Sequence, residues 1–283
     1  MPEQRRTRAA HVATVLRTEK LSTSLVRVVL GRPGLDQFGV PEFADSYVKV
    51  VFVDAAVQRP FPRTVDGRVE IDALHDDPAC APRIRSYTVR HFDAGSRELT
   101  LDFVVHGDAG LAGPWASHVE AGNEVLLMGP GGAWSPDPSA GFHLLAGDLS
   151  ALPAIAVSLS RLPDSASGAV FVEVPDGSDE LPLEAPSGVD VTWLHQGDER
   201  PGSLLVEAVR ALPWPGHDLQ AFVHGEAGAV KELRRYLRNE HRLPLERLSA
   251  SGYWRLGVDD EGWRASKREW KAEVERDEAA APR

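Results

Sequence analysis

Residues 85–90, Arg-Ser-Tyr-Thr-Val-Arg, combine a positive charge, a flat aromatic ring and a hydroxyl group on one expected strand. A second apolar run leads to His106-Gly107, and a stretch rich in Gly and Pro follows at residues 110–117. Aromatic faces pack on planar rings, while Arg and the N–H groups at helix starts bind phosphate. The pattern predicts a site for a planar cofactor with a pyrophosphate, such as a flavin nucleotide. Ordinary strand composition is the open alternative.

A second set of candidate residues occurs where an apolar strand is expected to lead into a helix. The turn at residues 147–153 has the sequence Gly-Asp-Leu-Ser-Ala-Leu-Pro, in which Ser150 is a suitable N-cap. Backbone N–H groups in such a turn bind an anion or a ribose. Helix capping explains the same pattern, and the turn lacks the Gly-x-Gly-x-x-Gly fingerprint of dinucleotide-binding folds, so both interpretations stay open.

Two acidic residues mark the ends of other expected strands. Glu173 ends one strand, where an acidic side chain commonly binds the hydroxyls of an adenine ribose. The sequence His224-Gly225-Glu226-Ala227 ends another strand and begins a helix, so backbone can approach a ligand there too. The alternatives are a solvated strand end for Glu173 and, for Glu226, an acid favoured by the helix dipole.

Composition limits the chemistry that the chain carries out alone. Cys80 is the one cysteine, so no internal disulfide, thiolate zinc site or iron–sulfur cluster is expected, and redox chemistry requires an organic cofactor. No His/Asp arrangement accompanies Cys80, which favours an incidental thiol over a nucleophile. The sequence His75-Asp76-Asp77 offers metal ligands, but without a second cluster a solvated turn is favoured, and we expect no metal site.

Length and charge restrict the class of protein further. A chain of 283 residues is long enough for two domains, and 31 basic against 42 acidic residues give a net charge of −11, which argues against general nucleic-acid binding. No apolar stretch approaches a membrane span, and the first ten residues lack the apolar core of a secretory signal. We therefore expect a soluble, cytoplasmic protein with neither a membrane nor a nucleic-acid partner.

The elements that must position these residues differ between the two halves. Six short runs in the first half, rich in Val, Leu, Thr and aromatic residues, predict a small antiparallel barrel with strands at 11–19, 22–30, 46–53, 84–92, 98–105 and 124–128. A helix is expected at 114–119, a long loop or flap at 58–82 with an apolar island at 69–74, and an interdomain linker at 129–141.

Strands and helices alternate in the second half, which predicts a parallel sheet covered on both faces, with ligands at the carboxyl ends of its strands. The expected strands are 142–146, 169–174, 189–194, 220–224 and 247–254. One expected helix follows the turn at 147–153 and ends at 162, and two others span 203–211 and 228–239. The tail at 259–275 has helical composition, with Trp263 and Trp270 seven residues apart on one face.

Taken together, these residues resemble the siderophore-interacting protein family, flavin-dependent ferric-siderophore reductases related to the ferredoxin-reductase superfamily. The resemblance covers almost the whole chain, with several motifs in the same order. The most specific motifs are Arg85-x-Tyr87-Thr88-x-Arg90, His106-Gly107 with Gly113-Pro114-Trp115-Ala116, Gly129-Pro130-Gly131-Gly132, Gly147-Asp148-x-Ser150-Ala151-Leu152-Pro153-Ala154, and Gly252-Tyr253-Trp254-Arg255-x-Gly257.

The resemblance implies a six-stranded antiparallel Greek-key barrel that binds FAD, at residues 8–133. A Rossmann-like α/β domain that binds NAD(P)H and ends in a helical tail is implied at residues 141–283. Tyr87 would pack against the isoalloxazine, Thr88 would hydrogen-bond near its reactive nitrogen, and Arg85 would pair with phosphate. The other implied cofactor-binding residues of the barrel are Ser86, Asp102, Val104 and His106, with Gly113, Pro114, Trp115, Ala116 and Ser117 at the pyrophosphate.

In the second domain the expected cofactor-binding residues are Gly147, Asp148, Ser150, Ala151, Pro153, Glu173, Gly225, Glu226, Tyr253 and Trp254. Two residues depart from the family pattern. Ser150 replaces a frequent Thr and keeps the hydroxyl, whereas His224 replaces a more usual small residue and leaves the nicotinamide contact open. The long tail resembles a branch of the family in which a C-terminal helix covers the flavin and ferredoxin is sometimes the donor, so NAD(P)H and ferredoxin both remain candidates.

The implied reaction reduces ferric siderophores and releases ferrous iron. Hydride carries two electrons and ferric iron accepts one, a mismatch that a flavin bridges. Because catecholate siderophores are anionic, the expected substrate-binding cations are Lys49 and the helix-face set Arg264, Lys267 and Arg268. Pairing of that set with Glu261 or Glu269 is the alternative. A general flavoprotein reductase and a siderophore-binding flavoprotein without turnover are the competing functions.

Overall fold

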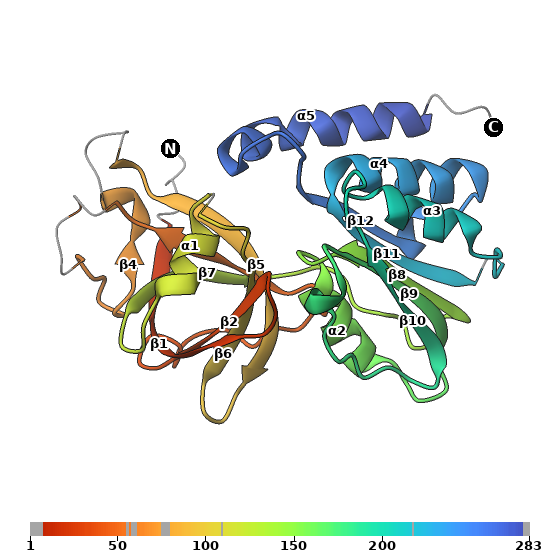
Figure 1. The fold of residues 1–283 in the computed structure, drawn as a ribbon. Coiled ribbons are helices and arrows are strands. Elements are labelled where there is room, and N and C mark those ends of the chain that lie inside the picture. Colours follow the sequence, from red (N-terminus) through yellow and green to blue (C-terminus); the bar gives the residue numbers. More distant parts are fainter. Residues whose placement is uncertain are drawn as a thin grey trace, which may run out of the picture. The chain divides into compact units, whose positions relative to one another are not determined.

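A computed structural model of the 283-residue chain describes residues 8–54, 57, 61–74, 80–108, 110–216 and 218–279. The chain divides into two compact units, one made of residues 1–20 and 26–133 and the other of residues 21–25 and 134–283. The sequence His75-Asp76-Asp77 lies outside the described residues. Figure 1 shows the elements of both units.

The first unit is a closed barrel of six antiparallel strands. Its sheet has the order β2-β6-β5-β3-β7-β1, and β2 also pairs with β1, which closes the ring and leaves no open edge. The prediction of a six-stranded barrel is therefore confirmed. The strands are β1 Ala9–Lys20, β2 Leu25–Gly31, β3 Tyr47–Phe52, β5 Arg83–Asp93, β6 Glu98–Val104 and β7 Glu124–Gly131.

The connectivity of the barrel is a Greek key. Strands β3, β5 and β6 follow one another among the six barrel strands and lie side by side, and β7 returns to lie beside β3, which gives the spatial order β7-β3-β5-β6. Alternate residues of each strand point inward, and Leu30, Val48, Leu101, Phe103 and Leu127 are at most 1% exposed in the barrel core. Strand β7 continues to Gly131, so the start of the predicted linker is strand instead.

Helix α1, Ala112–His118, lies between β6 and β7 in the sequence and begins two residues earlier than predicted. Ala112 and Ala116 pack into the barrel core. A Cβ atom on Gly113 would lie 3.1 Å from the carbonyl oxygen of Val104, so glycine permits the close approach of α1 to the end of β6.

The prediction of an irregular segment at 58–82 is wrong for its apolar island. Strand β4, Val69–Glu70, pairs with β1, and the 3₁₀ turn η1, Ile71–Ala73, follows it. Val69, Ile71 and Leu74 are buried in a separate cluster with Phe61. The island is ordered because its three apolar side chains pack together with Phe61. The many Pro, Asp and Arg residues around it favour the prediction of a loop.

The second unit contains a five-stranded parallel sheet with the order β10-β9-β8-β11-β12. Helix α2 covers one face, and α3 and α4 cover the other, as Figure 1 shows. Because β9 and β10 follow on one side of β8 and β11 and β12 on the other, the strand order reverses between β8 and β11. The strands are β8 Phe142–Asp148, β9 Ser167–Val174, β10 Gly188–His195, β11 Leu219–Glu226 and β12 Leu248–Trp254, with helices α2 Leu152–Arg161, α3 Ser203–Ala211 and α4 Ala227–Arg235.

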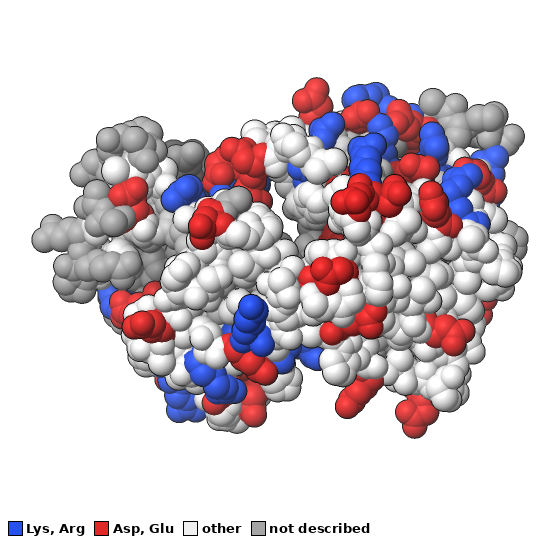
Figure 2. Space-filling view, in the orientation of Figure 1, with Lys and Arg blue, Asp and Glu red and all other residues white. Residues whose placement is uncertain are grey.

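Helix α5, Asp260–Ala279, packs along α4 in the second unit. Trp263 and Trp270 lie on one face, as predicted, with ring centres 5.5 Å apart and 2% and 6% exposed fractions. Ion pairs join the polar edges of the two helices: Lys231 pairs with Glu273 and Asp277, and Arg234 with Glu278. Figure 2 shows acidic and basic side chains interspersed over this region.

We predict that Trp270→Ala lowers the free energy of unfolding of the second unit by about 3–5 kcal/mol, because it removes a buried indole from the α4–α5 interface. Urea denaturation followed by circular dichroism measures this loss. Glu275→Ala on the exposed side of α5 is the control and should change the free energy by less than about 0.5 kcal/mol. Equal effects of the two substitutions would contradict the packing role.

Candidate functional site

The residues of the Arg-x-Tyr-Thr motif lie on β5, opposite β3. Tyr87 pairs with Val48 and Arg85 with Val50, and both valines are core residues. Directly opposed residues of an antiparallel pair point to the same side of the sheet, so Arg85 and Tyr87 are on the core side of β5. Arg85 is 7% exposed, and Tyr87 is half-buried.

The opposite side of the same strands carries four polar or aromatic residues. Thr88 pairs with Tyr47, and Ser86 with Lys49. Ser86, Lys49 and Tyr47 are exposed, whereas Thr88 is 7% exposed. Lys49 of the expected substrate site and Thr88 of the expected flavin site thus share the outward side of the β3–β5 pair. Tyr47 lies outside every motif considered in the sequence.

Tyr87 is one end of a series of aromatic rings. Its ring centre lies 4.1 Å from that of Phe103 on β6, which lies 5.3 Å from Trp115 on α1, and Trp115 lies 5.5 Å from Phe52 on β3. Offset and edge contacts of this kind stabilise aromatic pairs by about 0.5–1.5 kcal/mol each. The series holds α1 against β3 and β6, and it supports the Tyr87 ring from one side.

Asp102 on β6 forms a bidentate ion pair with Arg27 on β2. Arg27 Nε donates to one carboxylate oxygen at 2.7 Å, and its terminal Nη2 donates to the other at 2.9 Å. These hydrogen bonds raise the pKa of Arg27. Both oxygens of Asp102 thus have a partner within the barrel, and its contact with a cofactor stays a prediction.

The glycine-rich segment after β6 has the backbone conformations that its composition predicts. Gly107 and Gly110 adopt positive φ angles of 59° and 81°, which residues other than glycine rarely adopt. His106 and Ser117 are exposed, Val104, Pro114 and Trp115 are half-buried, and Gly113 and Ala116 are buried. Ser117 Oγ donates to the carbonyl oxygen of Gly113 at 3.1 Å, so this hydroxyl has a partner within α1.

The residues of the barrel fit an FAD nucleotide by the chemistry of their groups. A half-buried tyrosine ring suits the isoalloxazine, a guanidinium suits phosphate, and the backbone around Gly107, Gly110 and Gly113 lacks side chains that would block a pyrophosphate.

In the second unit, the carboxylate of Asp148 joins the ends of three parallel strands. It accepts hydrogen bonds from the backbone N–H of Ser150 at 2.9 Å, the hydroxyl of Ser150 at 2.5 Å, the backbone N–H of Glu226 at 2.9 Å and the indole N–H of Trp254 at 2.7 Å. Burial raises the pKa of Asp148, and these hydrogen bonds oppose that change. Asp148 therefore stabilises the carboxyl edge of the sheet where the strand order reverses.

Two helix starts at the same edge are occupied by internal carboxylates. Glu173, 3% exposed, accepts from the N–H groups of Gly202 and Leu205 at 2.5 and 3.0 Å at the start of α3, and burial raises its pKa. Glu226, 4% exposed, caps α4 by accepting from Gly228 and Ala229. Glu173 is therefore not a solvated strand end. Glu226 is the N-cap of α4, which agrees with the alternative of an acid favoured by the helix dipole.

The start of α2 also differs from its prediction. Ala151 is the N-cap, and the hydroxyl of Ser150 donates to Asp148, so the prediction of Ser150 as the N-cap is wrong. An N-cap hydroxyl must accept a hydrogen bond from an N–H group of the first turn, whereas the Ser150 hydroxyl precedes the N-cap and donates to the Asp148 carboxylate. A Cβ atom on Gly147 would lie 2.5 Å from the Cβ of Ala151, so this position is too closely packed for a side chain. Pro153 contributes no N–H group to the first turn.

His224 is buried near the end of β11, on the same side of the sheet as Phe222. It is 3% exposed, stacks on Phe222 with ring centres 3.8 Å apart, and its Nε2 lies 2.8 Å from the hydroxyl of Ser249. Tyr253 meets its ring edge-on at 5.0 Å. Burial, and secondarily the charge of Lys267, lower the pKa of His224 to about 3.

The expected cations of α5 have different environments. Arg264 and Arg268 are exposed, whereas Lys267 is half-buried, with its Nζ 5.8 Å from the ring centre of Trp263. Burial and the neighbouring Lys271 lower the pKa of Lys267.

Gly225, with φ of 137°, is held so close to Asp148 that a Cβ atom there would lie 2.5 Å from the carboxylate oxygen.

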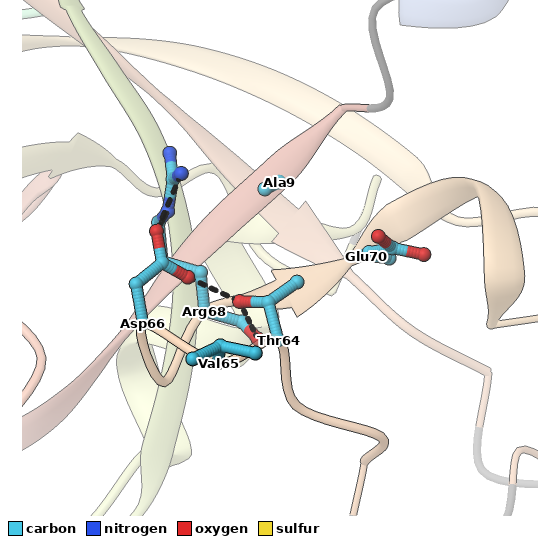
Figure 3. Close-up of a pocket in the computed structure, with 6 residues that line it drawn as sticks. All are labelled: Ala9, Thr64, Val65, Asp66, Arg68 and Glu70. Atoms are coloured by element: carbon cyan, nitrogen blue, oxygen red, sulfur yellow. Dashed lines mark hydrogen bonds and ion pairs between the residues drawn. The ribbon is translucent and has the colours of Figure 1, made fainter.

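A pocket of about 730 Å³ lies beside β4, at a distance in the sequence from all predicted site residues. Figure 3 shows Asp66 pointing toward both Thr64 and Arg68, and it accepts hydrogen bonds from both. Arg68 Nε donates at 2.7 Å. Because these polar groups already bind one another, the pocket supplies no convergent set of groups for a ligand.

The described residues contain no group of three or more His, Cys, Asp or Glu side chains arranged to hold a metal ion. Within the same part of the chain, every helix is too short or too polar to span a membrane. Cys80 is a free, half-buried thiol.

Comparison with known proteins identifies the family. Residues 14–134 match the model of the siderophore-interacting FAD-binding domain, and residues 140–257 match that of the siderophore-interacting protein. Ferric vibriobactin reductase ViuB of Vibrio cholerae is 36% identical over 258 residues, covering 88% of this chain and 90% of its own. The chain belongs to the siderophore-interacting protein family.

Further members and relatives of the siderophore-interacting protein family agree with this assignment. The NADPH-dependent ferric-chelate reductase of Escherichia coli is 28% identical over 85% of this chain and 91% of its own. The crystal structure of the siderophore-interacting protein SipS from Aeromonas hydrophila superposes with a TM-score of 0.78 and 28% identity, covering 93% of this chain and 98% of the other. The two chains therefore share the same fold over most of their lengths.

We predict that His224→Gln makes the stability of the protein less sensitive to acid. A folded-state pKa of about 3 against an ordinary value of 6.5 means that the unfolded chain binds more protons in this range, so protonation favours unfolding as pH falls. Between pH 7 and 5 the wild type should lose about 2 kcal/mol more than the variant. Denaturant unfolding of both proteins at the two pH values measures the difference, and an identical loss would contradict it.

Proposed function

We propose that this protein is an FAD-dependent oxidoreductase that reduces ferric siderophores and thereby releases ferrous iron in the cytoplasm. The matched FAD-binding domain, with the Arg85, Tyr87 and Thr88 motif on β5, is the observation that carries the proposal. ViuB and the E. coli ferric-chelate reductase support the choice of ferric chelates as the substrate class. Bound FAD would accept two electrons from its donor and pass them singly to iron.

The chain would contribute binding, orientation and charge. Arg85 and the backbone near Gly113 would hold the phosphates. The Tyr87 ring, which packs on Phe103, would pack against the isoalloxazine. Thr88 would orient the ring edge by a hydrogen bond. Lys49 on β3 and Arg264, Lys267 and Arg268 on α5 would attract an anionic chelate, which a net charge of −11 otherwise repels.

NAD(P)H is the proposed electron donor, by likeness to the NADPH-dependent ferric-chelate reductase of E. coli. The carboxyl edge of the parallel sheet, where the strand order reverses between β8 and β11, is the expected position for a dinucleotide. The expected contacts there involve Gly147, Ala151, Pro153, Tyr253 and Trp254.

Reduced ferredoxin is the second candidate donor, and a specific observation favours it. Glu173 and Glu226 already accept from the N–H groups at the starts of α3 and α4, and Pro153 removes a donor from α2. A pyrophosphate at these helix starts would have to compete with a bound carboxylate. A protein donor has no need of these N–H groups.

We predict that the purified protein is yellow and loses its colour anaerobically when the right donor is added, with colour restored by a ferric siderophore. One titration compares NADH, NADPH and reduced ferredoxin by flavin absorbance. Bleaching by ferredoxin alone would refute NAD(P)H as donor. A protein without flavin would contradict the proposed function, and a flavin that no donor reduces would favour a siderophore-binding flavoprotein instead.

We predict that Lys49→Ala and Lys267→Ala, tested singly, each raise the KM for an anionic ferric chelate by about three- to tenfold, since an exposed or half-buried charge contributes about 0.5–1.5 kcal/mol to binding an opposite charge. Steady-state kinetics measures KM, and flavin absorbance checks that FAD binding is intact. Lys20→Ala, at the end of β1, is the matched control. Unchanged KM in both variants would remove these residues from the substrate site.

A further inference from the structure

The outward side of the β3–β5 pair carries a tyrosine that no sequence motif includes. Tyr47 is the first residue of β3 and is 37% exposed, so much of its ring area contacts water. It lies opposite Thr88 on β5, and Lys49 projects from the same side of the same strand. An aromatic ring and an ammonium group are therefore presented together by one strand, beside the buried Thr88.

The Tyr47 ring is seated on a glycine. Strand β7 pairs with β3 on its other side, with Gly131 opposite Tyr47. A Cβ atom on Gly131 would lie 2.9 Å from Tyr47 Cζ and 3.0 Å from its Oη, so the ring occupies the space that a side chain would fill. The ring position depends on the absence of that side chain. Gly131 has no positive φ angle, so its backbone does not require glycine.

Tyr47 and Lys49 are two residues apart along an extended strand, which places their Cα atoms about 7 Å apart. A ligand with an aryl ring over Tyr47 can therefore extend negatively charged oxygens toward Lys49. An aliphatic ligand gains less from the ring, because it lacks the second π face that aromatic stacking needs. The pair thus distinguishes ligands by their aromatic content as well as by charge.

We propose that Tyr47 is a specificity-determining residue that binds the aryl ring of catecholate-type ferric chelates and discriminates against aliphatic hydroxamate chelates. The reduction of such a chelate rests on the proposed function, but its binding to Tyr47 does not. Tyr47 acts by packing on the ligand and takes no part in electron or proton transfer.

Calorimetric titration of the FAD-loaded full chain with gallium(III) tris-catecholate tests the binding, because gallium does not undergo reduction under these conditions. Tyr47→Ala should weaken the catecholate Kd about tenfold, whereas Tyr47→Phe, which keeps the ring, should stay within about twofold of the wild type. Gly131→Ala should displace the ring and also weaken binding. A gallium trihydroxamate chelate should show Kd values within about twofold of one another with all four proteins.

Several results would overturn the inference. The first is that the wild type does not bind the gallium catecholate. The second is that Tyr47→Ala loses the same affinity for both chelates, and the third is that Tyr47→Phe binds the catecholate as weakly as Tyr47→Ala does. Far-UV circular dichroism and flavin absorbance identify a variant that fails to fold. If Tyr47→Ala does not fold, Gly131→Ala with the two chelates decides the question, because it displaces the same ring. If the wild type binds the gallium catecholate but reduces no ferric chelate, the proposed function fails while the inference stands.

Discussion

The antiparallel register of β3 against β5 is the constraint on which the candidate site of the barrel depends. With Val48 opposite Tyr87 and Val50 opposite Arg85, the two valines fill the core, and the alternate residues Tyr47 and Lys49 face outward. A slip of one residue would turn Lys49 inward and expose both valines. Burying an unpaired ammonium group costs several kcal/mol, so core packing keeps the side chains of the candidate site facing outward.

A second constraint operates at the carboxyl edge of the parallel sheet, where three acidic residues serve the fold. Asp148 joins the ends of β8, β11 and β12, while Glu173 and Glu226 accept from the first N–H groups of α3 and α4. The unpaired donors at a helix start attract any anion, from the chain or from a ligand. Where the chain supplies the carboxylate, the N–H group already has a hydrogen-bond acceptor. A dinucleotide phosphate would have to displace that carboxylate, which is the reason for considering ferredoxin beside NAD(P)H as the source of electrons.

The two tyrosines of the β3–β5 pair illustrate how one residue type has different environments on opposite sides of a sheet. Tyr87 packs on Phe103, whose side chain is fully buried, and retains partial exposure. Tyr47 rests on a glycine of β7 and presents its ring to solvent. The proposed roles follow from this difference, since the supported inner ring suits a tightly held cofactor and the outer ring suits a ligand that must enter and leave.

The sequence by itself determined the order of strands and helices, the barrel followed by a parallel sheet, and the family with its FAD-binding domain. These features depend on local periodicity and on short motifs, and both are encoded by residues a few positions apart. Only the tertiary structure revealed the pairing of Arg27 with Asp102, 75 residues away, the capping roles of Glu173 and Glu226, and the seat of Tyr47 on Gly131. Such contacts depend on strand register and close packing between distant segments, which no local pattern in the chain specifies.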